Sequence, residues 1–102
     1  MRLITKQAIN AFNNNEDFSK DNTQVVATGN VVMLYLFGNQ IAKKVLSDYE
    51  SNKWDLFITH CVYKTNTTRE RLNGLDGVSI KQKKGVWYLN VNPWDGKSVL
   101  VD

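Results

Sequence analysis

Short apolar segments alternate with turn residues along much of the chain. Three of these segments are Thr23 to Thr28, Val31 to Phe37 and Gln40 to Leu46. The pairs Gly29-Asn30 and Gly38-Asn39 separate them, which predicts consecutive antiparallel hairpins. The middle segment is apolar on both faces, so we expect a central strand that is covered on both sides.

The turn at Gly38-Asn39 also predicts a register. A two-residue loop with Gly first favours a type II′ turn. The loop would then place Leu36 opposite Ile41 and Leu34 opposite Lys43.

A first helix is expected over residues 5–14. Thr5 is the expected N-cap, and Ala8, Ile9 and Phe12 share one face that should dock on the sheet. The polar stretch that follows, up to Asn22, predicts an exposed connection.

A second short helix is expected over residues 67–73. Thr67 and Glu70 have the spacing of a capping box, and Asn73-Gly74 provides a C-terminal stop that tolerates the left-handed conformation. Thr68, Leu72 and Leu75 form the stripe that should face inward.

The remaining pattern adds a loop, two further strands and another turn. The loop is Ser47 to Lys53, and the strand after it is Trp54 to Tyr63. Asn92 to Gly96 reads as a turn, and Ser98 to Val101 as a closing edge strand.

The clearest hairpin joins Val78–Lys83 to Val86–Val91 through Lys84-Gly85. Its pleat predicts two faces. The core face would hold Val78, Ile80, Trp87, Leu89 and Val91. The solvent-exposed face would hold Ser79, Lys81, Lys83, Tyr88 and Asn90.

Length and composition agree with one small domain. The 102 residues are 42% hydrophobic, enough for one core without disulfide or metal staples. We therefore predict a single α+β domain over residues 1–102, a mainly antiparallel twisted sheet of five to seven strands with two short helices.

Charge and cysteine content narrow the function. The net charge is +3, and its excess lies in the second half, which excludes a strongly acidic mimic of DNA. One Cys, no signal-peptide pattern and no apolar run longer than seven residues predict a protein of the reducing cytoplasm with no membrane role.

The sequence offers no catalytic constellation. His60-Cys61 is the one pairing of a base with a sulfur nucleophile, but on a strand these neighbours would point to opposite faces. One His and one Cys are too few for a zinc site, so we expect no metal and no cofactor. We therefore predict that the protein is not an enzyme.

A basic, aromatic surface carries what functional content there is. Its expected members are Arg69, Arg71, Lys81, Lys83, Lys84, Tyr88 and Trp94. Lysines beside an aromatic ring are typical of single-strand binding surfaces, although lysines on an exposed hairpin also keep a small domain soluble. An exposed Trp is a typical anchor of protein interfaces, although a turn Trp also folds back over a core.

Three segments in the last third of the chain carry a family resemblance: Thr65 to Leu75, Gly77 to Asn90 and Trp94 to Gly96. They resemble a family of short proteins of tailed bacteriophages, and the hairpin from Leu34 to Lys44 does so more loosely. The loop from Asp48 to Lys53 departs from that pattern. The resemblance implies a phage origin and transfers no catalytic residue.

Two functions follow as hypotheses. The first is a non-enzymatic phage accessory protein that binds a host bacterial protein, as an inhibitor of a host or defence factor, with Trp94, Tyr88 and the nearby basic residues as its contact surface. The alternative is a small nucleic-acid-binding module for single-stranded DNA or RNA. Neither hypothesis predicts an oligomeric state.

Overall fold

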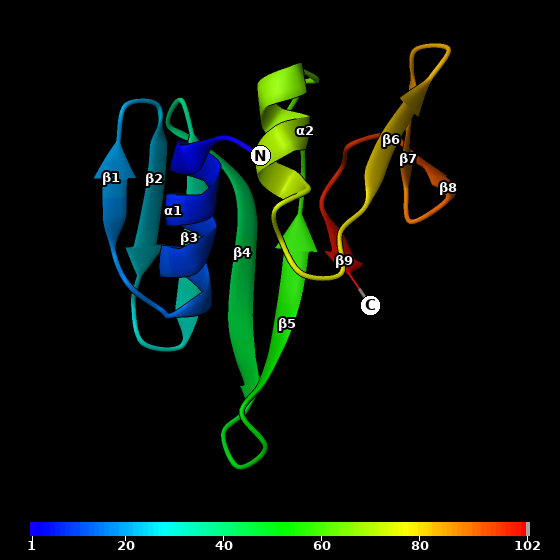
Figure 1. The fold of residues 1–102 in the computed structure, drawn as a ribbon. Helices are drawn as coiled ribbons and strands as arrows, with labels where there is room; N and C mark the ends of the chain where they lie inside the picture. The colour runs from blue at the N-terminus through cyan, green and yellow to red at the C-terminus, as the bar shows by residue number, and fades with distance from the viewer. Residues whose placement is uncertain (102) are drawn as a thin grey trace.

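The computed structural model describes residues 1–101 and contains two helices and nine strands in that range (Figure 1). The helices are α1 (Leu3–Asn13) and α2 (Asn66–Leu72). The strands are β1 (Phe18–Lys20), β2 (Thr23–Ala27), β3 (Val31–Leu36), β4 (Asn39–Asp48), β5 (Lys53–Ile58), β6 (Ile80–Lys83), β7 (Val86–Leu89), β8 (Asn92–Trp94) and β9 (Val99–Val101). The predicted α+β class is confirmed.

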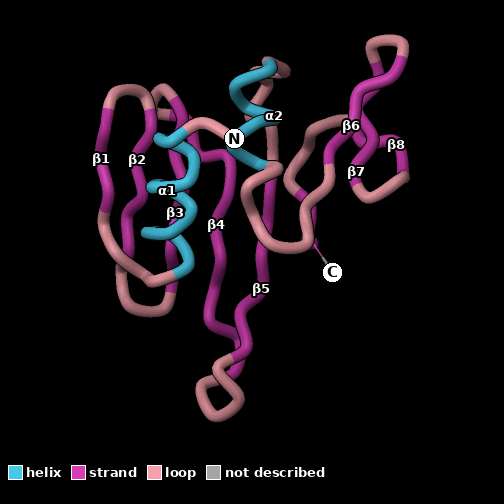
Figure 2. The backbone as a smooth tube through the Cα atoms, in the orientation of Figure 1, coloured by secondary structure: helices cyan, strands magenta, loops and turns pink. Residues whose placement is uncertain are grey.

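The strands form two antiparallel sheets (Figure 2). The larger has the order β1-β2-β3-β4-β5-β9, so its six strands fall within the predicted range. Its last member, β9, pairs with β5 and is the closing edge strand that the sequence indicated. The smaller sheet, β6-β7-β8, stands apart at one end of the molecule.

The core lies between the helices and one face of the large sheet. Ala8, Ile9 and Phe12 are buried on α1, as predicted. The alternation along β3 buries Val32, Leu34 and Leu36 toward the helices. The apolar spacing of helix and strand therefore specifies this layer, because each buries a single stripe.

The other face of the large sheet has no helix on it. Both helices lie on the core side (Figure 1), and Val31, Met33 and Tyr35 on the opposite face stay partly exposed. The expectation that β3 is covered on both sides is therefore wrong. An apolar strand predicts burial of both faces, and this chain supplies a cover for only one.

The β3–β4 turn is one residue earlier than predicted. Phe37 and Gly38 occupy its two central positions, with φ of 51° and 77°. Asn39 pairs with Leu36, and a bulge then places Leu34 opposite Ala42. The predicted register is wrong because Gly at the second position favours a type I′ turn, in which both φ values are positive.

Both helices begin earlier than their predicted caps. Thr5 lies inside α1 and is fully buried. In α2 the N-cap is Thr65, whose hydroxyl accepts a hydrogen bond from the backbone N–H of Thr68 (3.1 Å). The predicted capping box of Thr67 and Glu70 is wrong, because Glu70 takes part in a different contact.

The stripe predicted on α2 is confirmed, and the helix ends at Leu72, next to the predicted stop at Asn73-Gly74. The left-handed conformation expected of that stop is wrong, because Asn73 has φ of −67°. Thr68, Leu72 and Leu75 are buried. Gly74 is outside the left-handed region, and a Cβ there would lie 2.7 Å from Ile9 Cγ1. Gly74 therefore allows close packing of the two helices and does not provide a left-handed stop.

Three other boundaries differ from prediction. The expected exposed connection contains the short edge strand β1. The predicted strand over Trp54 to Tyr63 ends at Ile58, so His60 and Cys61 lie in a loop. The expected loop over Ser47 to Lys53 is shorter, because β4 continues to Asp48.

The last hairpin follows its predicted register up to Ile80 and Leu89. Beyond that point Val91 leaves the core and occupies a turn, with φ of 70° and 89% of its surface exposed. The predicted turn over Asn92 to Gly96 begins instead with β8, which adds a third strand to the hairpin.

Candidate functional site

The outer face of the three-stranded sheet carries most of the predicted binding residues. Lys81 pairs with Tyr88, and Tyr88 pairs with Pro93, so one row crosses all three strands. Lys83 lies nearer the hairpin tip, and Lys84 occupies the turn itself, with φ of 52°. The lysines are exposed and Tyr88 is half-buried. We call Lys81, Lys83, Lys84 and Tyr88 the lysine face.

No ion pair among the residues that the structure describes neutralises the charges of the lysine face. The one ion pair among residues 1–101 joins Arg71 to Glu70. Lys64 adds a further ammonium group at the hairpin tip, because its Nζ donates a hydrogen bond to the carbonyl of Gly85. The lysine face and Lys64 therefore create a local positive potential that favours an anionic partner.

Trp94 does not belong to the lysine face. It pairs with Trp87 on the inner side of the small sheet, and the two ring centroids are 6.2 Å apart. Its indole N–H donates to the carbonyl of Lys97 (3.0 Å). The structure therefore separates Trp94 from Tyr88, although the sequence placed them on one contact surface.

Arg69 lies at the inner side of the hairpin. Its guanidinium donates to Gln82 Oε1 (3.2 Å) and Asn66 Oδ1 (3.1 Å). Gln82 Oε1 also accepts from the Trp87 indole (3.3 Å). Arg69 thus connects α2 to the hairpin from the side opposite the lysines.

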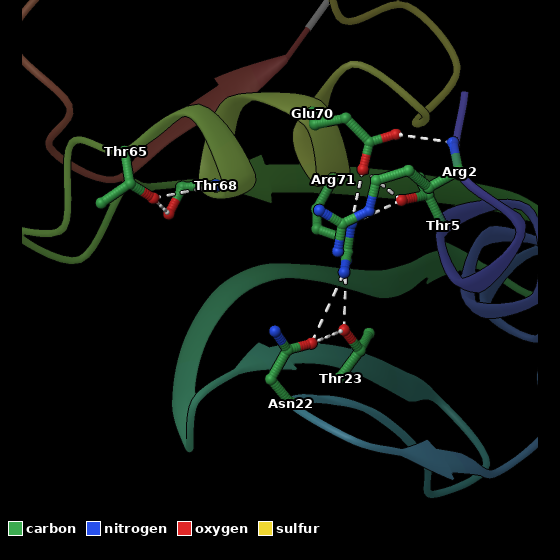
Figure 3. A network of polar contacts seen from close by, with 8 residues as sticks. All are labelled: Arg2, Thr5, Asn22, Thr23, Thr65, Thr68, Glu70 and Arg71. Carbon is green, nitrogen blue, oxygen red and sulfur yellow. Dashed lines mark hydrogen bonds and ion pairs between the residues drawn. The ribbon is translucent and has the colours of Figure 1, made fainter.

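Arg71 is buried, so its predicted place on the surface is wrong. Its side chain has no solvent exposure and donates hydrogen bonds to Thr5 Oγ1 (2.6 Å) and Thr23 Oγ1 (3.1 Å) (Figure 3). It also pairs with the Glu70 carboxylate. These contacts join α1, α2 and β2, and a buried guanidinium requires such partners.

Glu70 is the acceptor at the centre of this network. It accepts hydrogen bonds from the Thr5 hydroxyl and from the backbone N–H of Arg2. Partial burial alone would raise the pKa of Glu70, but these two hydrogen bonds and the charge of Arg71 outweigh it and lower that pKa below its ordinary value. The carboxylate therefore stays ionised, and Glu70 is not available to cap α2.

His60 links the two sheets. Its ring lies 5.6 Å from the Trp87 ring and 5.9 Å from the Trp94 ring, measured between centroids. It also lies against Gly96, where an added Cβ would be 1.8 Å from His60 Nε2. The buried Nδ1 has no hydrogen-bond partner among the described residues.

The His60–Cys61 argument from strand alternation is wrong in its premise, because Cys61 lies in a loop with φ of 51°. No group of three or more His, Cys, Asp or Glu side chains that could hold a metal ion occurs in residues 1–101. The His60 ring packs against two tryptophan rings and against Gly96.

A site that the sequence did not indicate lies at the end of β3. An apolar cavity of about 210 Å³ is lined by Leu36, Phe37, Asn39, Ile41, Tyr63, Thr65 and Thr68. Phe37 and Tyr63 are the exposed residues of its lining with large apolar surface, at 71% and 53% exposure. No lining residue carries a charge. We call this site the Phe37 pocket.

Backbone strain accompanies these exposed apolar side chains. Phe37 has φ of 51°, and Val62, next to Tyr63, has φ of 61° with 86% of its surface exposed. Large and β-branched side chains are disfavoured at positive φ, where Asn or Gly would fit. Neither solubility nor backbone stability accounts for these residues in their turns. The sequence holds one signal that could have indicated this site: Phe37, a large apolar residue, directly precedes the turn glycine Gly38.

One family model matches residues 1–100, and its description is Kyanoviridae Gp96 protein. The chain belongs to this phage family. The resemblance to short proteins of tailed phages is thereby confirmed, because the matched family is one of tailed cyanophages. No curated protein and no solved structure matches this Gp96 family member. Neither helix of residues 1–101 has the length and apolar content required to span a bilayer.

Proposed function

We propose that this Gp96 family member acts without catalysis, by stoichiometric binding to a protein of the host bacterium, in the host cytoplasm. The observation that carries the proposal is the Phe37 pocket with its exposed, strained rim. Exposure at positive φ is not sufficient, because Val91 has both. At Phe37 the strained and exposed side chain also borders an apolar cavity, a combination that supports a role in contact.

The chemistry of the pocket specifies the kind of partner. Its apolar walls come from Leu36 and Ile41, and its size suits one apolar side chain. Asn39 and Thr65 supply polar groups at the rim. A Leu, Met or Phe side chain of the partner would insert into the pocket and pack against Phe37 and Tyr63. Aromatic anchors of this kind contribute a large share of the binding energy of protein interfaces.

A matched pair of variants tests this proposal. Phe37→Asn removes the anchor and creates Asn-Gly, the preferred pair for a type I′ turn, so the fold should be retained. Val91→Asn makes the same kind of change in the β7–β8 turn. Tagged wild-type protein and the Val91 variant should retain one host protein from nuclease-treated cyanobacterial lysate, and the Phe37 variant should not. Equal capture by all three proteins would exclude the pocket.

The lysine face favours a second candidate, binding of single-stranded nucleic acid. Its ammonium groups are unpaired in residues 1–101, and Tyr88 provides a ring on which a base can stack. Because Trp94 points inward and Arg71 is buried, this face lacks the Trp and Arg that are enriched in protein interfaces. It keeps lysines, which are depleted there, and is therefore a poorer protein interface.

Titration of labelled single-stranded DNA and RNA at two salt concentrations tests this candidate. Lys83→Ala should weaken binding and reduce the salt slope by about 0.7 for one lost phosphate contact. Lys20→Ala removes the same charge from β1, at the opposite end of the molecule, and should leave binding unchanged. No binding at low salt, or equal losses in both variants, would exclude this function.

A further inference from the structure

The face of the large sheet without helices is more apolar than a solvated sheet face should be. Residues that share this face are Ser19, Gln24, Val26, Val31, Met33, Tyr35, Gln40, Lys43, Val45, Asp48, Lys53, Asp55, Phe57 and Leu100. Antiparallel sheets with one face in water normally alternate apolar and polar residues. β3 carries no charged side chain, and its one polar group is the Tyr35 hydroxyl.

Four apolar side chains form a stripe across this face. Val31 on β3 pairs with Val45 on β4, and Phe57 on β5 pairs with Leu100 on β9. Val45 and Phe57 are diagonal neighbours, since Val45 pairs with Asp55 two residues before Phe57. The stripe therefore crosses four adjacent strands on a diagonal. We call Val31, Val45, Phe57 and Leu100 the diagonal stripe.

One cation and one anion flank the diagonal stripe on opposite sides. Lys43 pairs with Phe57 and lies on the Met33 side, with its Nζ 5.6 Å from the centroid of the Phe57 ring. Asp55 pairs with Val45 and lies on the other side. Neither is in the single ion pair found in residues 1–101. Within residues 1–101 the face thus has no net charge, because Lys53 pairs with Asp48 at its far end. Lys43 and Asp55 lie across the stripe from each other.

This arrangement is self-complementary, and we propose that the face binds a second copy of this chain. A twofold axis along the diagonal stripe brings each of its residues against the same residue of the other copy. The same rotation places Lys43 of one copy opposite Asp55 of the other, twice. The strands of the two copies then cross steeply, as in orthogonal sheet packing.

The area of the face sets the strength of the association. Five strands about 4.8 Å apart and three rows about 7 Å apart give a footprint of roughly 500 Å². A standard stable interface buries about 800 Å² on each partner. We therefore expect a reversible dimer whose population rises with concentration. The Phe37 pocket and the lysine face are formed by other residues, so dimerisation does not depend on either proposed function.

Charge reversal tests the arrangement. Sedimentation velocity of the wild-type protein should show a shift from monomer to dimer over a roughly hundredfold range of concentration. Lys43→Asp and Asp55→Lys each place like charges together and should favour monomer, whereas the double variant restores both pairs and the dimer. Lys20→Asp on β1 is the matched control and should dimerise normally.

Cysteine trapping keeps the proposal testable if a charge variant fails to fold. In a Cys61→Ser background, Val45→Cys lies on the twofold axis and should form a disulfide with its own copy. Val26→Cys lies on the same face away from the diagonal stripe and should not. A wild-type monomer at every concentration, a double variant that stays monomeric while folded, or equal crosslinking of both cysteines would overturn the proposal.

Discussion

At the scale of single residues, the hydrogen-bond partners of a charged side chain determine whether it is buried or exposed more than its residue type does. Arg69 and Arg71 are two positions apart on a short helix, yet Arg71 is fully buried and Arg69 is not. Sequence alone could not separate them, because the partners of Arg71 come from α1 and β2, more than 40 residues away. Lys81 and Lys83, by contrast, are exposed as predicted, since strand alternation is local.

Replacing Arg71 by Ala should therefore destabilise the fold strongly. The change leaves Glu70 without its cationic partner and the Thr5 and Thr23 hydroxyls without their donor. Breaking a fully buried pair costs about 3–5 kcal/mol, and the loss here should be near the lower end, because Glu70 keeps 27% of its side-chain surface exposed. Urea denaturation should show this loss, whereas Arg69→Ala should cost about 1 kcal/mol or less. Similar midpoints for the two variants would contradict the structural role of Arg71.

At the scale of elements, the type of the longer helices and strands was predictable, whereas their boundaries and the short strands β1 and β8 were not. The spacing of Thr68, Leu72 and Leu75 indicated α2 correctly, but the cap lies at Thr65 and not at Thr67. Both residues are Thr, so the sequence offers two starts. The longer helix is compatible with Glu70 in the Arg71 network, and this tertiary contact outweighs a local capping box.

Replacing Thr65 and Thr67 separately by Ala distinguishes the two caps. Loss of the Thr65 hydroxyl removes the hydrogen bond to the Thr68 N–H and should lower the free energy of unfolding by about 1 kcal/mol. Thr67→Ala should change it by less than about 0.5 kcal/mol, because no capping bond is lost. Thermal denaturation measures the loss of stability in both variants. A larger loss for Thr67→Ala than for Thr65→Ala would support the predicted capping box instead.

At the scale of the whole molecule, the two sheets are joined by a contact that no local sequence pattern predicts. Gly96 is one of six glycines and reads as an ordinary turn residue. In the structure its carbonyl accepts hydrogen bonds from the His60 N–H and the Thr59 hydroxyl, and its Cα lies under the His60 ring. The sequence predicted one sheet because this junction is made by residues 37 positions apart.

Gly96→Ala tests the junction. An added methyl group would overlap the His60 ring, and φ of 86° is strained for any other residue, so the variant should lose several kcal/mol of stability, about 3 or more. Gly29→Ala provides the control: its φ is 71°, but no atom lies within 4 Å of the new Cβ. It should cost only about 1 kcal/mol. Equal losses by chemical denaturation would show that the junction contributes nothing.

Photo-crosslinking in infected host cells tests most directly whether the Phe37 pocket contacts a host protein. A benzophenone analogue of phenylalanine in place of Phe37 keeps the ring in the rim, and the same analogue in place of Val91 is the exposed control in a comparable turn. We predict one dominant host-protein adduct from position 37 and none from position 91. No adduct at position 37, or the same adducts at both positions, would contradict the proposed contact.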